Sequence, residues 1–172
     1  DGRDCPGLTT VYLRLAWSHL EPEPGRHVWS ICDTVIARYA AAGKRFALRV
    51  TAFEGDPKQG TPDWVRRQGA QGRVVETFGV RSWEPDYDDP VFLKALGRFL
   101  RAAGRRYDGN PRLAFVDVGT LGLWGEGHPI ARRYGLATLR RHIDLHRAAF
   151  PKATLVAQDD WNTWFSEAGR PT

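Results

Sequence analysis

The segment 115–128 combines residue types that could carry out a reaction. A largely apolar run, 115–118, leads into three glycines, a tryptophan at position 124 and the carboxylate of Glu126. Such a run is typical of a buried strand. A carboxylate that follows a strand of a parallel sheet lies at the edge where catalytic groups gather. Glu126 is therefore the first candidate for a catalytic residue.

The glycines at positions 119, 122 and 125 do not form a dinucleotide-binding motif. Their spacing differs from G-x-G-x-x-G, and no helix is expected to begin there, so no cofactor is predicted. His142 and His146 are four residues apart on an expected helix, a spacing that could bind a metal. They lack the glutamate of a zincin motif, so we interpret them as a solvated surface pair and predict no metal site.

Aromatic and acidic residues gather after the expected strands. The tryptophans there are Trp17, Trp64, Trp83, Trp124, Trp161 and Trp164, and the acids are Glu21, Glu23, Glu54, Asp56, Glu84, Asp86, Asp88, Asp89, Glu126, Asp159 and Asp160. An indole stacks on the apolar face of a pyranose, while carboxylates accept hydrogen bonds from its hydroxyls. This distribution favours a carbohydrate site. The alternative is that the tryptophans fill the core and the acids solvate loops.

Strand and helix patterns alternate along the chain. Strands are expected at 10–16, 45–52, 113–118 and 153–157, and helices at 29–42, 90–107 and 135–150, with a long irregular segment before residue 90. Repeated strand–helix units predict an α/β fold with a parallel sheet. The helix-to-strand connections are short and contain glycine or proline, whereas the strand-to-helix connections are long.

Two arginines, Arg14 and Arg49, lie within expected strands. A buried cation without a partner is costly, so we expect both to pair with carboxylates near the site. The rigid Glu-Pro-Glu-Pro sequence at 21–24 indicates that Glu21 shapes its loop rather than catalyses. The candidate substrate-binding residues are Trp17, Glu21, Arg14, Arg49, Trp64, Trp124, His128, Asp159 and Trp161.

The net charge of +5 is due largely to arginine, yet its pattern does not indicate a nucleic-acid partner. In the helix expected at 90–107, apolar residues recur at spacings of three and four, which predicts one buried stripe. The arginines occupy the solvated face: Arg98, Arg101, Arg105 and Arg106. No run approaches the roughly 18 apolar residues of a membrane span, so no membrane partner is predicted.

The chain contains no methionine, so we interpret residues 1–172 as one partial domain, truncated at both ends. The compartment is left open, and secretion is compatible with a leader that precedes residue 1. Cys5 and Cys32 could pair only if the N-terminal segment folded back, and we favour free thiols. The sequence does not define an oligomeric state.

Residues 11–25, followed by Trp29 and Asp33, resemble the second strand and loop of clan A glycoside hydrolases. The similarity is greatest to the β-galactosidase-like branch, family 42-like, in which a tryptophan, then Leu-Glu-Pro and glycine precede the helix. Residues 43–45, the Thr-Pro-Asp-Trp-Val segment at 61–65 and the strand before Glu126 continue the match in order. An uncharacterised group of glycosidase-like barrel domains with Trp-Gly-Glu after this strand is also similar.

The resemblance implies a TIM (β/α)8 barrel, of which these four strands correspond to the second to fifth. A complete barrel needs about 250 residues, so a partial barrel is expected. In the clan the acid/base glutamate follows the fourth strand, which matches Glu126, and the nucleophile follows the seventh. The clan usually has asparagine before the acid/base, whereas Gly125 stands there.

The predicted function is retaining glycoside hydrolysis in the full-length parent, with a carbohydrate as partner. This chemistry uses two carboxyl groups about 5–5.5 Å apart, and Glu126 would have to be protonated to act as the acid. The isolated chain is expected to be inactive and poorly stable, since an opened parallel sheet exposes its edges. The alternative function is a non-catalytic carbohydrate-binding barrel.

Overall fold

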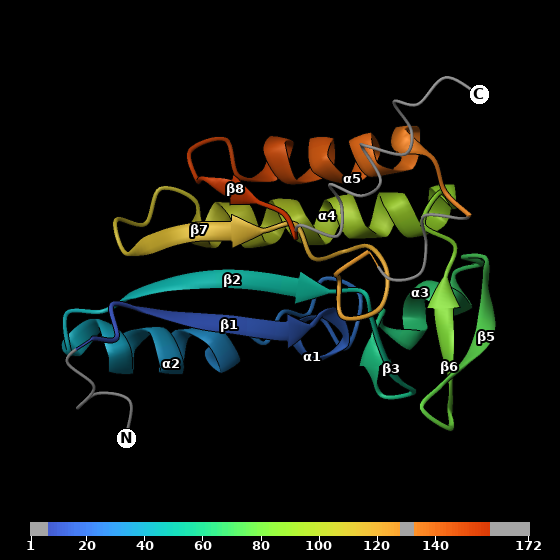
Figure 1. The fold of residues 1–172 in the computed structure, drawn as a ribbon, viewed down its shortest axis with the longest axis horizontal. Coiled ribbons are helices and arrows are strands. Elements are labelled where there is room, and N and C mark those ends of the chain that lie inside the picture. Colours follow the sequence, from blue (N-terminus) through green and yellow to red (C-terminus); the bar gives the residue numbers. More distant parts are fainter. Residues whose placement is uncertain (1–6, 128–132, 159–172) are drawn as a thin grey trace.

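The computed structural model describes residues 7–127 and 133–158. Its main sheet is fully parallel, in the order β1-β2-β7-β8, and Figure 1 shows the strands pointing in one direction. The strands are β1 (Thr10–Ala16), β2 (Arg45–Thr51), β7 (Leu113–Asp117) and β8 (Leu155–Val156). Each strand lies within or on the range expected from the sequence, so the predicted α/β order is confirmed.

Three long helices connect these strands: α2 (Ser30–Ala41), α4 (Pro90–Tyr107) and α5 (Leu136–Ala149). Helix α4 begins at a cap in which the Asp89 carboxylate accepts a hydrogen bond from the Phe92 backbone N–H, 2.8 Å away. Its apolar stripe, including Phe99, is buried, and its four arginines are exposed. The solvated-face interpretation of this helix is therefore confirmed. Among the described residues, no helix has the length and hydropathy to cross a membrane.

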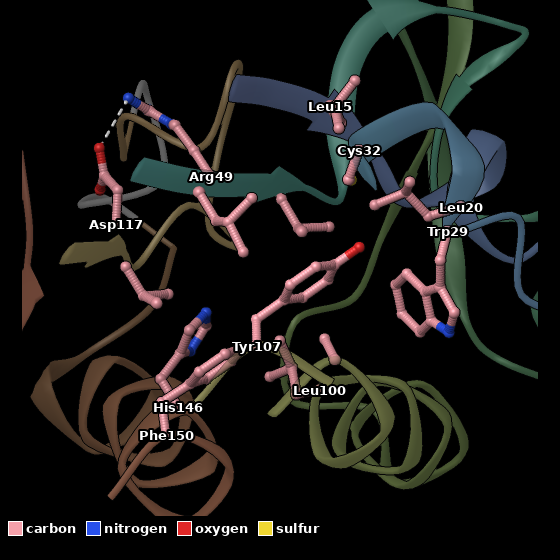
Figure 2. A pocket seen from close by; sticks show the side chains of 14 residues that line it. Leu15, Leu20, Trp29, Cys32, Arg49, Leu100, Tyr107, Asp117, His146 and Phe150 are labelled. Atoms are coloured by element: carbon pink, nitrogen blue, oxygen red, sulfur yellow. Dashed lines mark hydrogen bonds and ion pairs between the residues drawn. The ribbon is translucent and has the colours of Figure 1, made fainter. Parts of the chain in front are cut away.

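The two faces of the sheet have different surroundings. Side chains alternate along a strand, so Leu48 of β2 points toward the helices and Arg49 points away. Figure 2 shows Arg49 and Asp117 across the sheet from Tyr107 and Phe150, which come from the helical layer. A cavity of about 20 Å³, lined mainly by apolar side chains, lies between the sheet and this layer. The helices therefore cover one face, and the charged pair lies on the other.

The segment between residue 52 and residue 90, expected to be irregular, contains regular structure, so this part of the prediction is wrong. The elements there are β3 (Phe53–Asp56), β4 (Gln59–Gly60), α3 (Asp63–Arg67), β5 (Gly72–Thr77) and β6 (Val80–Pro85). A short helix, α1 (Trp17–Leu20), also follows β1 directly. Strands β3 and β4 form one hairpin, and β5 and β6 form another. The second hairpin turns at Phe78-Gly79, with both residues at positive φ. The usual Asn-Gly signal for such a turn is absent.

The surface interpretation of His142 and His146 is also wrong, because both side chains are completely buried on α5. His142 Nε2–H donates to the carbonyl of Tyr87 at 3.0 Å, and its Nδ1 lies 2.8 Å from the Thr120 hydroxyl. His146 Nδ1–H donates to the carbonyl of His142 at 2.8 Å. The two histidines lie on the inward face of α5 together with apolar residues. Hydropathy alone assigns a histidine to solvent, so it does not reveal this position.

Helices α4 and α5 touch at Gly104, and this contact gives a stability prediction. A Cβ at Gly104 would lie 1.9 Å from the backbone oxygen of Ala149. We expect Gly104→Ala to lower the free energy of unfolding by about 3 kcal/mol in urea titrations, because the backbones must separate. Gly97→Ala is the matched control, since its Cβ would meet the movable ends of Leu145 and Arg101. Equal effects at both positions would contradict this account.

Candidate active site

Glu126 lies in a loop of tight turns that follows β7. The N–H of Glu126 donates to the carbonyl of Leu123 at 3.0 Å, and the N–H of Gly125 donates to that of Gly122 at 3.1 Å. The N–H of Trp124 donates to the carbonyl of Phe53 on β3, which attaches the loop to the neighbouring hairpin. The Glu126 side chain is 27% exposed. The loop thus holds a partly accessible carboxylate at the carboxyl end of a parallel strand.

Two glycines explain how this loop approaches the sheet. A Cβ at Gly119 would lie 2.5 Å from Arg49 Cγ, and a Cβ at Gly125 would lie 2.0 Å from the backbone oxygen of Gly119. Gly125 also has φ +72°, which disfavours other residues. The loop therefore packs directly on Arg49, and Glu126 Oε1 lies 3.9 Å from Arg49 Nη2. Gly119 and Gly125 thus allow a close packing that a Cβ at either position would prevent.

Arg49 and Asp117 are buried and belong to a polar network in register across the sheet. Arg14, Arg49 and Asp117 are adjacent partners on β1, β2 and β7. Asp117 Oδ2 accepts hydrogen bonds from the Tyr12 hydroxyl at 2.5 Å and from Arg49 Nη1 at 3.4 Å. Gln158 Nε2 donates to the same oxygen at 3.0 Å. Burial, reinforced by the Asp117 hydrogen bond, raises the pKa of Tyr12 to about 12, so the phenol remains a donor at neutral pH.

Arg14 pairs with a different carboxylate. Its Nη2 lies 3.5 Å from Glu54 Oε2, and Glu54 Oε1 accepts a hydrogen bond from the Thr51 hydroxyl at 2.5 Å. The expectation that Arg14 and Arg49 pair with carboxylates is therefore confirmed. The strand ends bring together two guanidinium groups and the carboxylates of Glu54, Asp117 and Glu126.

Phe78 is a further site candidate that sequence reasoning missed. Its ring stacks on Trp124 with centroids 5.8 Å apart and planes 12° apart. The sequence gives little warning of this contact, because 46 positions separate the two residues. Tyr12 and Asp117 were also missed as site residues. Their signal was available: polar groups in register with Arg14 and Arg49 on strands predicted to be parallel.

Three predicted substrate-binding residues, Trp17, Glu21 and Trp64, belong instead to the core. All three are buried. The Glu21 carboxylate accepts hydrogen bonds from Trp17 Nε1 at 2.9 Å, the Gly25 N–H at 2.7 Å and Arg98 Nη2 at 3.1 Å. Trp64 Nε1 donates to the Glu21 carbonyl at 2.9 Å. Their substrate-binding assignment is corrected, because these groups already bind one another away from solvent. The structural interpretation of Glu21 agrees with this geometry.

Some predictions concern residues that lie outside the described structure. These are the substrate-binding assignments of His128, Asp159 and Trp161, and the state of Cys5. Cys32 is a buried free thiol on α2, and burial raises its pKa to about 11. A thiol with this pKa is protonated at neutral pH and is a weak nucleophile.

Comparison with known proteins identifies the family to which the chain belongs. The family model of glycoside hydrolase family 42, described as β-galactosidase, matches residues 6–120. The chain belongs to the family 42 glycoside hydrolases. The matched region includes Arg14, Arg49 and Asp117 and ends before Trp124 and Glu126. The resemblance recognised in the sequence is therefore confirmed.

Two curated relatives are similar over the same part of the chain. A β-galactosidase of Thermus thermophilus is 32% identical, and the β-galactosidase BgaA of a Thermus species is 31% identical, each over 114 residues. Each match covers 60% of this chain and 16% of the relative. The chain thus spans a small part of the length of these family 42 relatives.

Solved structures share the fold. The exo-β-1,4-mannosidase Op5Man5 from Opitutaceae bacterium strain TAV5 has a TM-score of 0.60 at 18% identity, over 88% of this chain and 25% of that one. Endo-glycoceramidase II from a Rhodococcus species has a TM-score of 0.55 at 18% identity, over 87% of this chain and 40% of that one. This family 42 chain therefore has the architecture of a partial TIM barrel, as predicted.

Proposed function

We propose that the full-length protein hydrolyses glycosides and that Glu126 is its general acid/base. The observation that carries the proposal is the position of Glu126 at the carboxyl end of β7, 3.9 Å from the buried Arg49, in a chain of family 42. Active sites of such barrels lie at this end of the strands. We further propose that the chain is one part of a single barrel domain and supplies its second to fifth strands.

The reaction needs a second carboxylate, which we place after the seventh strand of the complete barrel. That carboxylate attacks the anomeric carbon while Glu126 gives its proton to the glycosidic oxygen, and the bond between this carbon and oxygen breaks. A water molecule then attacks the glycosyl-enzyme as Glu126 removes its proton. Two displacements at one carbon retain the anomeric configuration.

The polar network around Arg49 would orient the reacting groups and the sugar. Tyr12 and Asp117 hold Arg49, which in turn faces Glu126. Among the residues that the structure describes, Arg49 Nη2 and Asp117 Oδ1 are buried without a hydrogen-bond partner. Such groups are costly unless a partner is supplied, and sugar hydroxyls would supply one. Arg14 and Trp124 are further candidates for contacts with the sugar.

The test is hydrolysis by the full-length protein. The curated relatives are β-galactosidases, so 4-nitrophenyl β-galactoside is the first substrate, followed by other aryl glycosides. We expect turnover and, by proton NMR, a first product with the same anomeric configuration as the substrate. A first product of the opposite configuration would contradict the two-displacement mechanism.

A non-catalytic carbohydrate-binding barrel is the second candidate. The observation that favours it is Gly125, which stands where the clan usually has asparagine. The backbone there has φ +72°, and a Cβ would lie 2.0 Å from the Gly119 oxygen, so this loop does not accommodate a side chain at position 125. Glycan binding by the full-length protein with no cleavage of any aryl glycoside would support this candidate.

A further inference from the structure

The stacked rings of Phe78 and Trp124 combine two unusual backbone conformations. In the part of the chain that the structure describes, these two are the non-glycine residues at positive φ, with values of 51° and 57°. Bulky residues rarely adopt this region, because the Cβ approaches the backbone oxygen. Strained residues gather at functional sites, where the surrounding structure holds them in place. Here two such residues hold their rings against each other.

The ring pair does not serve to build a core. Phe78 is 82% exposed, and Trp124 is half-buried. The hairpin tip nevertheless packs closely on β3. A Cβ added at Gly55 of β3 would lie 3.1 Å from the side chains of Thr77 and Leu123. A hairpin tip that is held in place and exposes an aromatic ring to solvent presents a flat apolar surface for a ligand.

The location of the pair indicates which ligand would use it. Figure 1 shows the β5–β6 hairpin beyond the carboxyl ends of β1 and β2, on the side to which the strands point. Trp124 is two residues before Glu126 in the loop after β7. The sugar that is cleaved would lie over Arg49 and Asp117 at the strand ends. The group bonded to the oxygen that Glu126 protonates would then extend outward, toward the hairpin.

We propose that Phe78 and Trp124 form a binding surface for a pyranose ring on the leaving-group side of a glycan. The proposal rests on the proposed function, because it places the scissile oxygen at Glu126. The apolar face of a pyranose stacks on aromatic rings, and the parallel ring pair offers such a surface. Phe78 would thus favour substrates whose leaving group is a sugar over those with a small leaving group.

The test uses the full-length protein with Phe78→Asn, because asparagine tolerates positive φ and replaces the aromatic ring with a small amide. We expect kcat/KM for lactose, whose leaving group is a sugar, to fall about 10-fold, as for the loss of one aromatic contact. The value for β-galactosyl fluoride, whose leaving group is a single atom, should not change. Phe78→Trp should restore lactose hydrolysis. Val74→Ala, which changes a 52% exposed side chain on the same hairpin, is the matched control.

Each outcome has a distinct meaning. An equal fall for both substrates, or no fall for lactose, would overturn the leaving-group surface while glycoside hydrolysis stands. If no glycoside is cleaved, the proposed function fails. The same variants are then titrated with a neutral oligosaccharide to which the wild type binds on a glycan array. Weaker binding by Phe78→Asn alone would then support a carbohydrate surface at the ring pair. Unchanged binding, or no glycan retained, would overturn it.

Discussion

In the full-length protein, Glu126→Ala is expected to lower kcat for phenyl β-galactoside by about 10²- to 10⁴-fold, the usual contribution of general acid catalysis. The phenolate leaves poorly unless its oxygen receives a proton as the bond breaks. With 2,4-dinitrophenyl β-galactoside the leaving group needs little protonation, so cleavage of the glycosidic bond should be much less affected. Steady-state and pre-steady-state kinetics with both substrates check this result.

Two further variants make the Glu126 experiment specific. Glu126→Gln keeps the size of the side chain and removes its acid function, so it should behave like the alanine variant. Glu23→Gln is the matched control, because this carboxylate is exposed on another loop and pairs only with Arg26 among the residues described. An equal loss for the two leaving groups in Glu126→Ala would show that Glu126 is not the acid, whatever else it binds.

A large loss of stability is expected in mild acid because of His142 and His146. Burial lowers the pKa of each ring from 6.5 to about 4. The unfolded chain therefore binds protons between these values while the folded chain does not. The contribution of the two neutral histidines to the free energy of unfolding is thus fully present above pH 6.5 and decreases as the pH falls toward 4. Each histidine should remove about 2 kcal/mol from the free energy of unfolding between pH 7.5 and 5.

Urea unfolding at a series of pH values measures this effect. His142→Gln and His146→Gln should each reduce the stability difference between pH 7.5 and 5 by about half of the histidine contribution, whatever they do to stability at neutral pH. His19→Gln is the matched control, since His19 is exposed on α1. A wild-type slope that neither buried-histidine variant reduces would contradict this assignment.

The sequence predicted the elements that carry strong periodicity. Helix α4 has a continuous apolar stripe, an acidic cap and a first-turn proline, and its observed bounds are the expected ones. The β5–β6 hairpin was missed because Phe78-Gly79 replaces the common turn residues and its apolar side chains face solvent. The buried histidines of α5 were missed because hydropathy does not report the carbonyl and hydroxyl partners that stabilise them.

The candidate site was predicted in part. The ion pairs of Arg14 and Arg49 were predicted because cations within strands have few physical explanations. Glu126 was singled out because it follows glycine-rich turns after a strand, and its catalytic role stays a prediction. Trp17 and Trp64 were assigned to the substrate because an indole suits both a sugar and a core. Only the arrangement in space separates these roles, and here both indole N–H groups bind Glu21.

The buried contacts of Glu21 also bear on how genomes are annotated. The tryptophan, Leu-Glu-Pro and Thr-Pro-Asp-Trp segments, which carry the resemblance to this family, meet at one buried glutamate, Glu21. A search that relies on these segments would select proteins that fold this loop, regardless of what they catalyse. Two homologues could share the whole pattern and differ in catalysis. Automated assignment of an enzyme activity should therefore depend on the residues at positions 119–126, which lie at and beyond the end of the family match.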